Sequence, residues 1–221
     1  MIMGNYIIIE GDEGAGKTTQ VDMLAQRLRG LDRRVETVRE PGGDRLGELL
    51  RLVLKADPQN ERYCRLRDDF LGGEDIDLGP EVETLAFLAA RQSMRRNIVY
   101  PRLVEGADVI SDRGEVSTLV YQGVAGHIDM DFLSVANEFV AKVAPPTVTI
   151  VLDIPLEVSQ ARQVGRNQGQ DRFEARGEDY RRSVNDGYRQ IANECLYPLI
   201  DADQPVREVH EEIWSVIRPL L

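Results

Sequence analysis

Cysteine, histidine and aromatic residues are scarce in this chain of 221 residues. The two cysteines, Cys64 and Cys195, do not form a C-x-x-C pair, so the sequence predicts neither a zinc site nor a disulfide framework. We expect both to be buried or incidental thiols. The two histidines, His127 and His210, have no partners at metal-ligand spacing and are given no role.

Long apolar runs and an excess of positive charge are also missing. No stretch approaches the ~18 apolar residues of a membrane span, and no basic region followed by an apolar segment marks the N-terminus. These absences predict a cytoplasmic protein without a membrane partner. The net charge of −11 argues against nucleic acid as a partner, because phosphate backbones attract basic surfaces. A local basic pocket for a small phosphorylated molecule stays compatible with this charge.

The most specific motif present runs from Gly11 to Thr18. It reads G-D-E-G-A-G-K-T and matches the phosphate-binding P-loop pattern G-x-x-x-x-G-K-[ST]. Its glycines allow a tight turn that points N–H groups at phosphate oxygens, and the next helix directs its positive end to the same place. We expect Lys17 to reach the β- and γ-phosphates and the Thr18 hydroxyl to hold Mg²⁺. The predicted ATP-binding residues here are Gly11, Asp12, Glu13, Gly14, Ala15, Gly16, Lys17, Thr18 and Thr19.

Strand and helix patterns alternate along the whole chain. The 42% hydrophobic and 29% charged residues are typical of a soluble globular protein, and the length suits one domain over residues 1–221. The alternation predicts an α/β fold of the P-loop NTPase type, with about five parallel strands and helices on both faces. In such sheets, ligands bind at the carboxyl ends of the strands.

Two carboxylates end predicted strands and could serve the metal. Asp112 follows an apolar run, as the carboxylate of a P-loop magnesium site does, and Asp153 ends the clearest strand of the chain. We favour Asp112 because Arg113 follows it, and an Asp-Arg pair can serve metal and phosphate together. The alternative is a plain turn at the end of a strand, where aspartate is common.

Three further segments carry structural expectations. Residues 55–80 are rich in charge and predict a surface excursion that is helical in part. A long helix is expected over 81–105, with its buried side formed by Val82, Leu85, Phe87, Leu88 and Ala89. The polar segment at about 164–173 predicts a flexible lid. Arginines on such a lid can neutralise the charge of a triphosphate, although a solvated basic surface explains them equally well.

Two sets of residues have the spacing of one helix face. Arg91 follows Phe87 by four positions, so a ring that stacks on a base would lie beside a guanidinium that donates to its edge. Tyr121 follows Ser117 at the same spacing and precedes Gln122, which suits a sugar or a base edge. Taken alone, each pattern is also typical of core packing and surface solvation.

Taken together, these segments resemble thymidylate kinase of the bacterial type over nearly the whole chain. The matching motifs, in the family's order, are I-E-G-D-E-G-A-G-K-T-T at 9–19, R-E-P-G-G at 39–43 followed by Gly47, Glu48 and Arg51, F-L-A-A-R at 87–91, D-R at 112–113 followed by Ser117, Thr118 and Y-Q-G at 121–123, and D-R-F-E at 171–174. The pair Asp112-Arg113 with the polar residues after it is the most distinctive of these matches.

The resemblance implies a set of substrate contacts. Phe87 would stack on thymine, Arg91 would bond to its edge, and Tyr121 would pack against the deoxyribose where a 2′-hydroxyl would clash. The remaining implied substrate-binding residues are Glu40, Arg51, Arg113, Thr118 and Gln122, of which Arg51 and Arg113 would hold the acceptor phosphate. The implied metal ligands are Thr18 and Asp112.

The resemblance also implies how the transfer is catalysed. Glu13 would lie near the 3′-hydroxyl and the reacting groups. Because this P-loop carries Glu13 and Ala15 and no arginine, a lid arginine takes the catalytic position; Arg166 is the first candidate and Arg162 the second. The implied catalytic residues are Lys17, Glu13, Arg113 and Arg166, and Arg162 and Arg172 are added to the ATP-binding set.

The chain departs from the family pattern at three places. Gly114 stands where an aromatic residue or histidine usually follows Asp-Arg, which would loosen the pocket wall or free the local backbone. Asp44 stands where a small or apolar residue is usual, and we expect it to face solvent, away from an acceptor phosphate. The excursion at 55–80 is longer than the family's and would alter the dimer surface or cover the acceptor site.

The resulting hypothesis is transfer of the γ-phosphoryl group of ATP to dTMP, giving dTDP and ADP for dTTP biosynthesis. Mg²⁺ is the implied cofactor and a homodimer the implied assembly. One alternative is a P-loop kinase that acts on a different nucleoside monophosphate. Another is a P-loop switch or ATPase that reports its nucleotide state to a protein partner, although a guanine-reading N-K-x-D motif is absent.

Overall fold

A single parallel sheet organises the computed structural model, which describes residues 4–75, 78–164 and 176–221. Within these residues five strands lie in the order β2-β3-β1-β4-β5, and every neighbouring pair is parallel. The strands are β1 (Tyr6–Gly11), β2 (Val35–Arg39), β3 (Asp108–Asp112), β4 (Val148–Asp153) and β5 (Leu199–Asp201). The predicted α/β fold with a five-stranded parallel sheet is confirmed.

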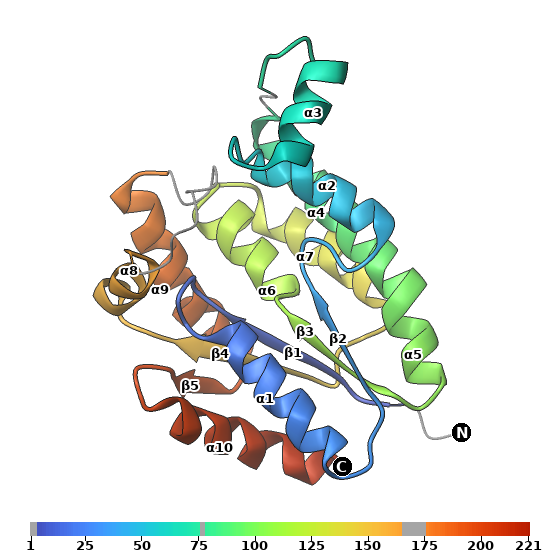
Figure 1. Cartoon of the computed structure of the whole chain (residues 1–221). Helices are drawn as coiled ribbons and strands as arrows, with labels where there is room; N and C mark the ends of the chain where they lie inside the picture. Colours follow the sequence, from blue (N-terminus) through green and yellow to red (C-terminus); the bar gives the residue numbers. More distant parts are fainter. Residues whose placement is uncertain (1–3, 76–77, 165–175) are drawn as a thin grey trace.

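Helices connect the strands and cover both faces of the sheet (Figure 1). They are α1 (Lys17–Arg29), α2 (Arg45–Lys55), α3 (Glu61–Phe70), α4 (Gly79–Met94), α5 (Tyr100–Val104), α6 (Glu115–Thr118), α7 (Met130–Ala141), α8 (Leu156–Val164), α9 (Glu178–Glu194) and α10 (Val206–Ile217). Two π-helical segments, η1 (Arg95–Val99) and η2 (Leu119–Val124), continue α4 and α6. Such segments often mark functional sites.

The alternation of side chains along β1 explains the two layers of helices. Ile7 and Ile9 point to one face and form a core with α1 and α10, whereas Tyr6 and Ile8 point to the other face. All of these side chains are fully buried. A strand that is apolar on both faces is typical of the centre of a parallel sheet. β1 therefore has a fixed position, and the loop at its carboxyl end is held firmly.

The second face of the sheet carries the helices that surround the candidate site. Val99 and Leu103, from η1 and α5, pack on Tyr6 and Ile8. A further cluster joins α6 and η2 to α9, through Val116, Val120, Val184, Tyr188 and Ile191. These helices bring residues from distant parts of the sequence to the carboxyl ends of β1 and β3.

The helix predicted over 81–105 is present as α4, η1 and α5, but its predicted buried side was largely wrong. Val82 and Leu85 are 52% and 57% exposed, and Ala89 is exposed as well. Of the residues predicted on that side, Leu88 is buried and Phe87 is half-buried. The inward face of α4 is instead polar, with Glu83, Thr84 and Arg91 buried. Apolar periodicity alone misplaced this face because the helix lines a polar site.

In the described part of the excursion at 55–80, the helix α3 projects from the body of the molecule above α2 (Figure 1). Asn60 caps it by accepting from the N–H groups of Arg62 and Tyr63. Tyr63 is fully buried and its hydroxyl donates to Asp75. Phe70, the last residue of α3, is 81% exposed. The helix is thus attached at its base, which agrees with the predicted surface excursion of partly helical structure.

Two P-loop glycines should respond differently to substitution by alanine. Gly11 has a φ of 142°, and a Cβ there would lie 2.5 Å from the carbonyl oxygen of Leu152. Gly16 has a φ of 86°, but a Cβ there would meet no atom within 4 Å. We expect Gly11→Ala to lower the free energy of unfolding by about 3 kcal/mol or more, and Gly16→Ala by about 1–2 kcal/mol. Denaturant unfolding of both variants checks this, and equal losses would contradict it.

Candidate active site

The loop between β1 and α1 has the geometry of an anion-binding turn. Gly16, the residue before α1, is in the left-handed conformation, and no side chain caps the helix or adds negative charge to its first turn. The N–H groups at this helix end are therefore available for an anion such as a phosphate. The loop itself is closed by the N–H of Ala15, which donates to the Asp12 carbonyl.

Lys17 lies folded over this loop and is only 6% exposed. Its Nζ donates to the Asp12 carbonyl at 2.8 Å and lies 3.8 Å from Oε2 of Glu13. Burial and nearby Arg113 lower the pKa of Lys17 from its ordinary value, against the opposing effect of Glu13. A bound triphosphate would offer this ammonium group a stronger partner than a neutral carbonyl.

The candidate metal ligands Thr18 and Asp112 are in direct contact. The Thr18 hydroxyl donates to Oδ2 of Asp112 at 2.6 Å, across the ends of α1 and β3. Asp153, the competing carboxylate, is instead held by both Nε and Nη2 of Arg189 at 3.0 and 2.8 Å. Hydroxyl and carboxylate oxygens are the hard ligands that Mg²⁺ prefers, so this pair fits the ion. In the described part of the chain, no group of three or more metal-binding side chains of His, Cys, Asp or Glu occurs.

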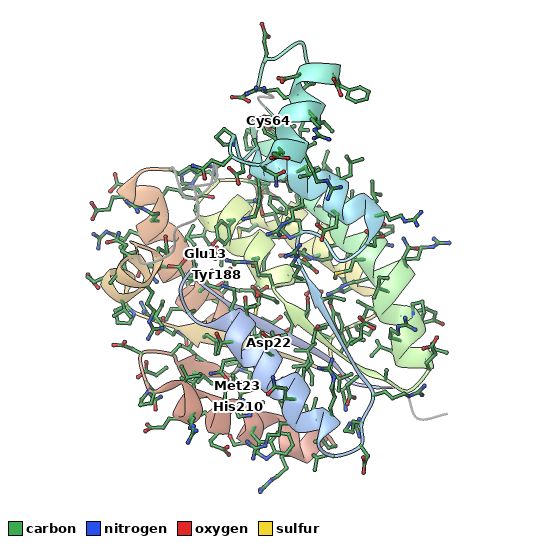
Figure 2. All side chains as sticks on the ribbon, in the orientation of Figure 1. Glu13, Asp22, Met23, Cys64, Tyr188 and His210 are labelled. Atoms are coloured by element: carbon green, nitrogen blue, oxygen red, sulfur yellow. The ribbon has the colours of Figure 1, made fainter. Side chains whose placement is uncertain are left out.

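Arg113 connects the turn after β3 to the P-loop. Its Nη2 donates to Glu13 Oε2 at 2.7 Å, and its Nη1 donates to the Gly11 carbonyl at 3.2 Å. Nη1 also donates to the hydroxyl of Tyr188 at 2.6 Å and to that of Ser117 at 3.2 Å. Figure 2 shows Glu13 and Tyr188 at the same end of the sheet, far from Cys64 on α3. A cation is thus fixed beside the phosphate loop.

The charge of Glu13 depends on its two basic neighbours. Burial alone would raise the pKa of this carboxyl, but Arg113 and Lys17 outweigh burial and hold the pKa well below its usual range. Glu13 therefore stays ionised at neutral pH, and its stabilising effect is lost only as pH falls through this depressed folded-state pKa. Lys17 and Arg113 therefore flank the Glu13 carboxylate at the P-loop.

Glu40 and Arg91 form a buried ion pair on the acceptor side. The Arg91 guanidinium is 2% exposed, and its Nε donates to Glu40 Oε2 at 2.5 Å. Its Nη1 donates to Asn137 at 2.8 Å and its Nη2 to the Gly114 carbonyl at 2.6 Å. An arginine carries five N–H donors, so further N–H groups remain for a base edge. Arg91 also ties the ends of β2 and β3 to α7.

The other residues expected at the base and the sugar surround this pair. Phe87 is half-buried on α4, the helix of Arg91. Thr118 is 1% exposed, and its hydroxyl has no partner among the described residues. Gln122 is buried and its Nε2 donates to Glu83 Oε1 at 3.1 Å. Tyr121 lies beside Arg113, with 5.3 Å from the guanidinium carbon to the ring centroid.

The structure gives the two unusual residues definite partners. Asp44 is partly exposed: it caps α2 through the N–H of Gly47 and accepts from Ser93 and Asn97 at 2.5 and 2.9 Å. Gly114 does not free the backbone, because its N–H and its carbonyl are both bonded. A Cβ at Gly114 would lie 2.8 Å from Ile8, so the packing leaves no room for a side chain.

The predicted phosphate arginines have different surroundings. Nη1 of Arg51 donates to the Pro41 carbonyl at 2.8 Å, which places it against the R-E-P-G-G turn. Arg162, on α8, donates to the carbonyls of Gly14 and Ala202 at 3.1 Å and so connects the P-loop to the turn after β5. Arg166 and Arg172, with most of the predicted lid, lie outside the described residues.

Several polar residues that sequence reasoning missed support these groups. Ser159 donates to the Glu13 carbonyl at 2.7 Å, and Asn185 donates to Asp12 Oδ2 at 3.0 Å. Tyr188 contacts Arg113, and Glu83 accepts from both Gln122 and Arg176. Each contact joins residues far apart in the sequence, so no local spacing signals it. The one pattern in the sequence that could have indicated such a residue is a polar side chain at an inward position of a helix, as Glu83 is on α4.

The fold and this site together define a P-loop phosphotransferase. The family model of thymidylate kinase matches residues 9–213. The thymidylate kinase of Rhodopseudomonas palustris is 35% identical over 98% of this chain and 90% of its own length. The thymidylate kinase of a Bradyrhizobium species is 35% identical over 99% of this chain and 91% of its own length. The thymidylate kinase of Afipia carboxidovorans is 34% identical over 97% of this chain and 89% of its own length. The chain belongs to the thymidylate kinase family.

Among the residues that the structure describes, no helix is both long and apolar enough to cross a membrane. The longest single α-helix among them, α9, has 17 residues and a strongly charged sequence. This finding agrees with the absence of long apolar runs in the sequence.

The two strand-end carboxylates can be separated by their Mg²⁺ dependence. Asp112→Asn removes the charge beside Thr18, so we expect a rate about 10- to 100-fold lower and a higher Mg²⁺ concentration for half-maximal rate. Asp153→Asn, the matched control, weakens only the pair with Arg189 and should leave the Mg²⁺ dependence unchanged, with a stability loss of up to about 1 kcal/mol. Mg²⁺ titrations of steady-state rate check this. An altered Mg²⁺ dependence in Asp153→Asn alone would contradict it.

Proposed function

We propose that this enzyme transfers the γ-phosphoryl group of ATP to dTMP, with dTDP and ADP as products. Family membership supports the substrate, and the contact of Arg113 with Glu13 is the observation that supports the mechanism. The Arg113 guanidinium contacts the P-loop, and the next residue, Gly114, contacts Arg91 on α4, which suits a group that brings an acceptor phosphate to the γ-phosphate. The chain acts as one kinase domain over residues 1–221.

The donor side consists of the loop at residues 11–16 and of α1. The N–H groups of the loop and Lys17 bind the β- and γ-phosphates and stabilise the transferring group. Thr18 and Asp112 would hold Mg²⁺, which when bound neutralises the charge of these phosphates. Arg162 supports the loop from α8 by its bond to the Gly14 carbonyl. We also assign Arg166 and Arg172 to ATP binding, as the resemblance to the family implies.

The acceptor side consists of residues that directly follow β2 and β3 and of residues on α2, α4, α6 and η2. Arg113 and Arg51 hold the acceptor phosphate, and Glu40 orders Arg91 for the base edge. Phe87, Thr118, Tyr121 and Gln122 line the base and sugar. A phosphate is already a good nucleophile, so orientation and charge are sufficient and no strong general base is required.

The second candidate is another monophosphate kinase of the same fold. Only the acceptor contacts distinguish it, because the P-loop would be unchanged. The Gln122–Glu83 contact favours dTMP over dCMP. With Nε2 committed to Glu83, the carbonyl oxygen of Gln122 remains to accept from an N–H, and thymine has an N–H at position 3 where cytosine has a lone pair.

A substrate panel tests the assignment. An assay that couples ADP release to a signal is run with dTMP, dUMP, dCMP and AMP. We expect kcat/KM for dTMP to exceed that for dUMP by about tenfold or more, which is the discrimination that one methyl group provides, and the others to be poorer still. Equal or better use of dUMP, dCMP or AMP would contradict the assignment. ADP release without any acceptor would favour the ATPase alternative.

The implied homodimer has a candidate surface. Val82 and Leu85 on α4 and Phe132, Val135 and Phe139 on α7 are between 46% and 67% exposed. The two helices pack against each other, and each set has the spacing of one helix face. Exposed apolar residues gathered in this way are typical of a subunit interface. We call these five residues the α4–α7 face and propose that a second copy of the chain covers it.

A charge on this face should disrupt the dimer. Val135, which is 67% exposed, becomes a buried position in the dimer, so Val135→Glu should give a monomer by light scattering after size-exclusion chromatography. Leu31→Glu, at a residue that is 54% exposed beyond the end of α1, is the matched control and should stay dimeric. A monomeric parent protein, or a dimer that tolerates Val135→Glu, would exclude this interface.

A further inference from the structure

Glu10, the residue just before the P-loop, has a fully buried carboxylate with three hydrogen bonds. Its Oε1 accepts from the N–H groups of Gly114 and Ser117 at 2.7 and 2.9 Å, and its Oε2 accepts from the Ser117 hydroxyl at 2.6 Å. A carboxylate is costly to bury unless such bonds compensate for lost water. All three bonds run from the end of β1 to the start of α6, the short helix that follows Arg113.

The turn that carries Arg113 is held in an unfavourable conformation. Arg113 has a φ of 80°, in the left-handed region that residues other than glycine rarely occupy. Such conformations persist only where the surroundings impose them, and they concentrate at functional sites. A substitution that loosened the surroundings would therefore release this turn and change the direction of the guanidinium.

The backbone N–H and carbonyl groups of Arg113 and Gly114 all have hydrogen-bond partners. The N–H of Arg113 donates to the Ile9 carbonyl at 2.9 Å, and its carbonyl accepts from Ser111 at 2.7 Å. The Gly114 carbonyl accepts from Arg91, and the Gly114 N–H donates to Glu10. Among these partners, Glu10 is the only side chain from β1, the strand that also carries the P-loop.

The side chain of Arg113 also contacts the segment that contains Glu10. Its guanidinium reaches back to the Gly11 carbonyl and to Glu13, one and three residues beyond Glu10. The chain segment 10–13 thus contacts both the backbone that follows Arg113 and the charged tip of the Arg113 side chain. We propose that Glu10 is a positioning residue, which fixes Arg113 at the distance from the P-loop that the acceptor phosphate requires. This inference rests on the phosphoryl transfer proposed above.

The alternative is that Glu10 only stabilises the fold as a cap of α6. If Glu10 is only a cap, its loss should lower the stability of the fold and change the kinetic constants for ATP and for the acceptor to the same extent. A positioning residue acts through Arg113, so its loss should affect the acceptor and not ATP, and should add little once Arg113 is absent. These two consequences are measurable apart from any effect on stability.

The test is a double-mutant cycle of Glu10→Gln and Arg113→Ala in the full chain. Glutamine keeps one acceptor oxygen but places an NH₂ group where Oε2 accepts from Ser117. We expect Glu10→Gln alone to lower kcat/KM for the acceptor about 10- to 100-fold, with KM for ATP within about twofold. In the Arg113→Ala background, the same change should cost less than about twofold. Equal losses in both backgrounds, or a matching loss of ATP affinity, would overturn the proposal.

Two further variants keep the test decisive. Asp108 is another fully buried carboxylate, which accepts from the Asn5 N–H and from Arg33 at the opposite end of the sheet. Asp108→Asn is the matched control and should lower the midpoint of thermal unfolding while both KM values stay unchanged. If Glu10→Gln does not fold, Glu10→Asp replaces it in the cycle, because the shorter side chain retracts the carboxylate from Gly114 but keeps its charge. The same non-additivity is expected, and additive losses would again overturn the proposal.

The double-mutant cycle uses whichever monophosphate the parent enzyme phosphorylates best. The proposed function and the positioning role of Glu10 can therefore fail separately. If the parent enzyme phosphorylates none of the panel, the proposed function fails. If it phosphorylates one of them but the losses at Glu10 and Arg113 add, the positioning role fails and the proposed function stands.

Discussion

The ion pair between Arg113 and Glu13 joins the two halves of the site, with 2.7 Å between Nη2 and Oε2. The side chains are 15% and 30% exposed, so the charges are partly shielded from water and interact more strongly than a surface pair would. Removing either partner leaves the other charge without compensation. The free-energy cost of that change is larger than the net stabilisation that the intact pair provides. The pair therefore fixes the distance between the donor loop and the acceptor arginine.

Further buried charges of both signs contact the residues that directly follow Arg113. Glu40 pairs with Arg91, and the fully buried Arg95 donates to Glu115. The guanidinium carbon of Arg95 lies 5.2 Å from the centroid of the Tyr6 ring. Burial raises the pKa of Glu40, against the opposing effect of Arg91 and Arg95. Such pairs contribute orientation more than stability, because desolvation offsets much of the attraction. Their positions under the turn at 112–114 explain how a strained segment stays in one conformation.

The elements that depend on local sequence were predictable, and those that depend on distant contacts were not. The P-loop and the strands at its sides follow from spacing and apolar runs, because the chemistry of each lies within a few residues. Glu10 and Tyr188 act across about 70 to 110 positions, so no spacing marks them. The buried side of α4 was misplaced for a related reason: the apolar residues on its outer face, Val82 and Leu85, lie where we propose a second copy, while its inner face is polar for the substrate.

The most direct measurement is a crystal structure with dTMP and a non-hydrolysable ATP analogue bound together. The central claim is that Arg113, held by Glu13 and Glu10, receives the acceptor phosphate beside the P-loop. The claim predicts a phosphate oxygen of dTMP within hydrogen-bond distance of the Arg113 guanidinium, in line with the γ-phosphate position, and the bonds of Glu10 to Gly114 and Ser117 intact. A dTMP phosphate held elsewhere, with Arg113 contacting protein groups alone, would contradict it.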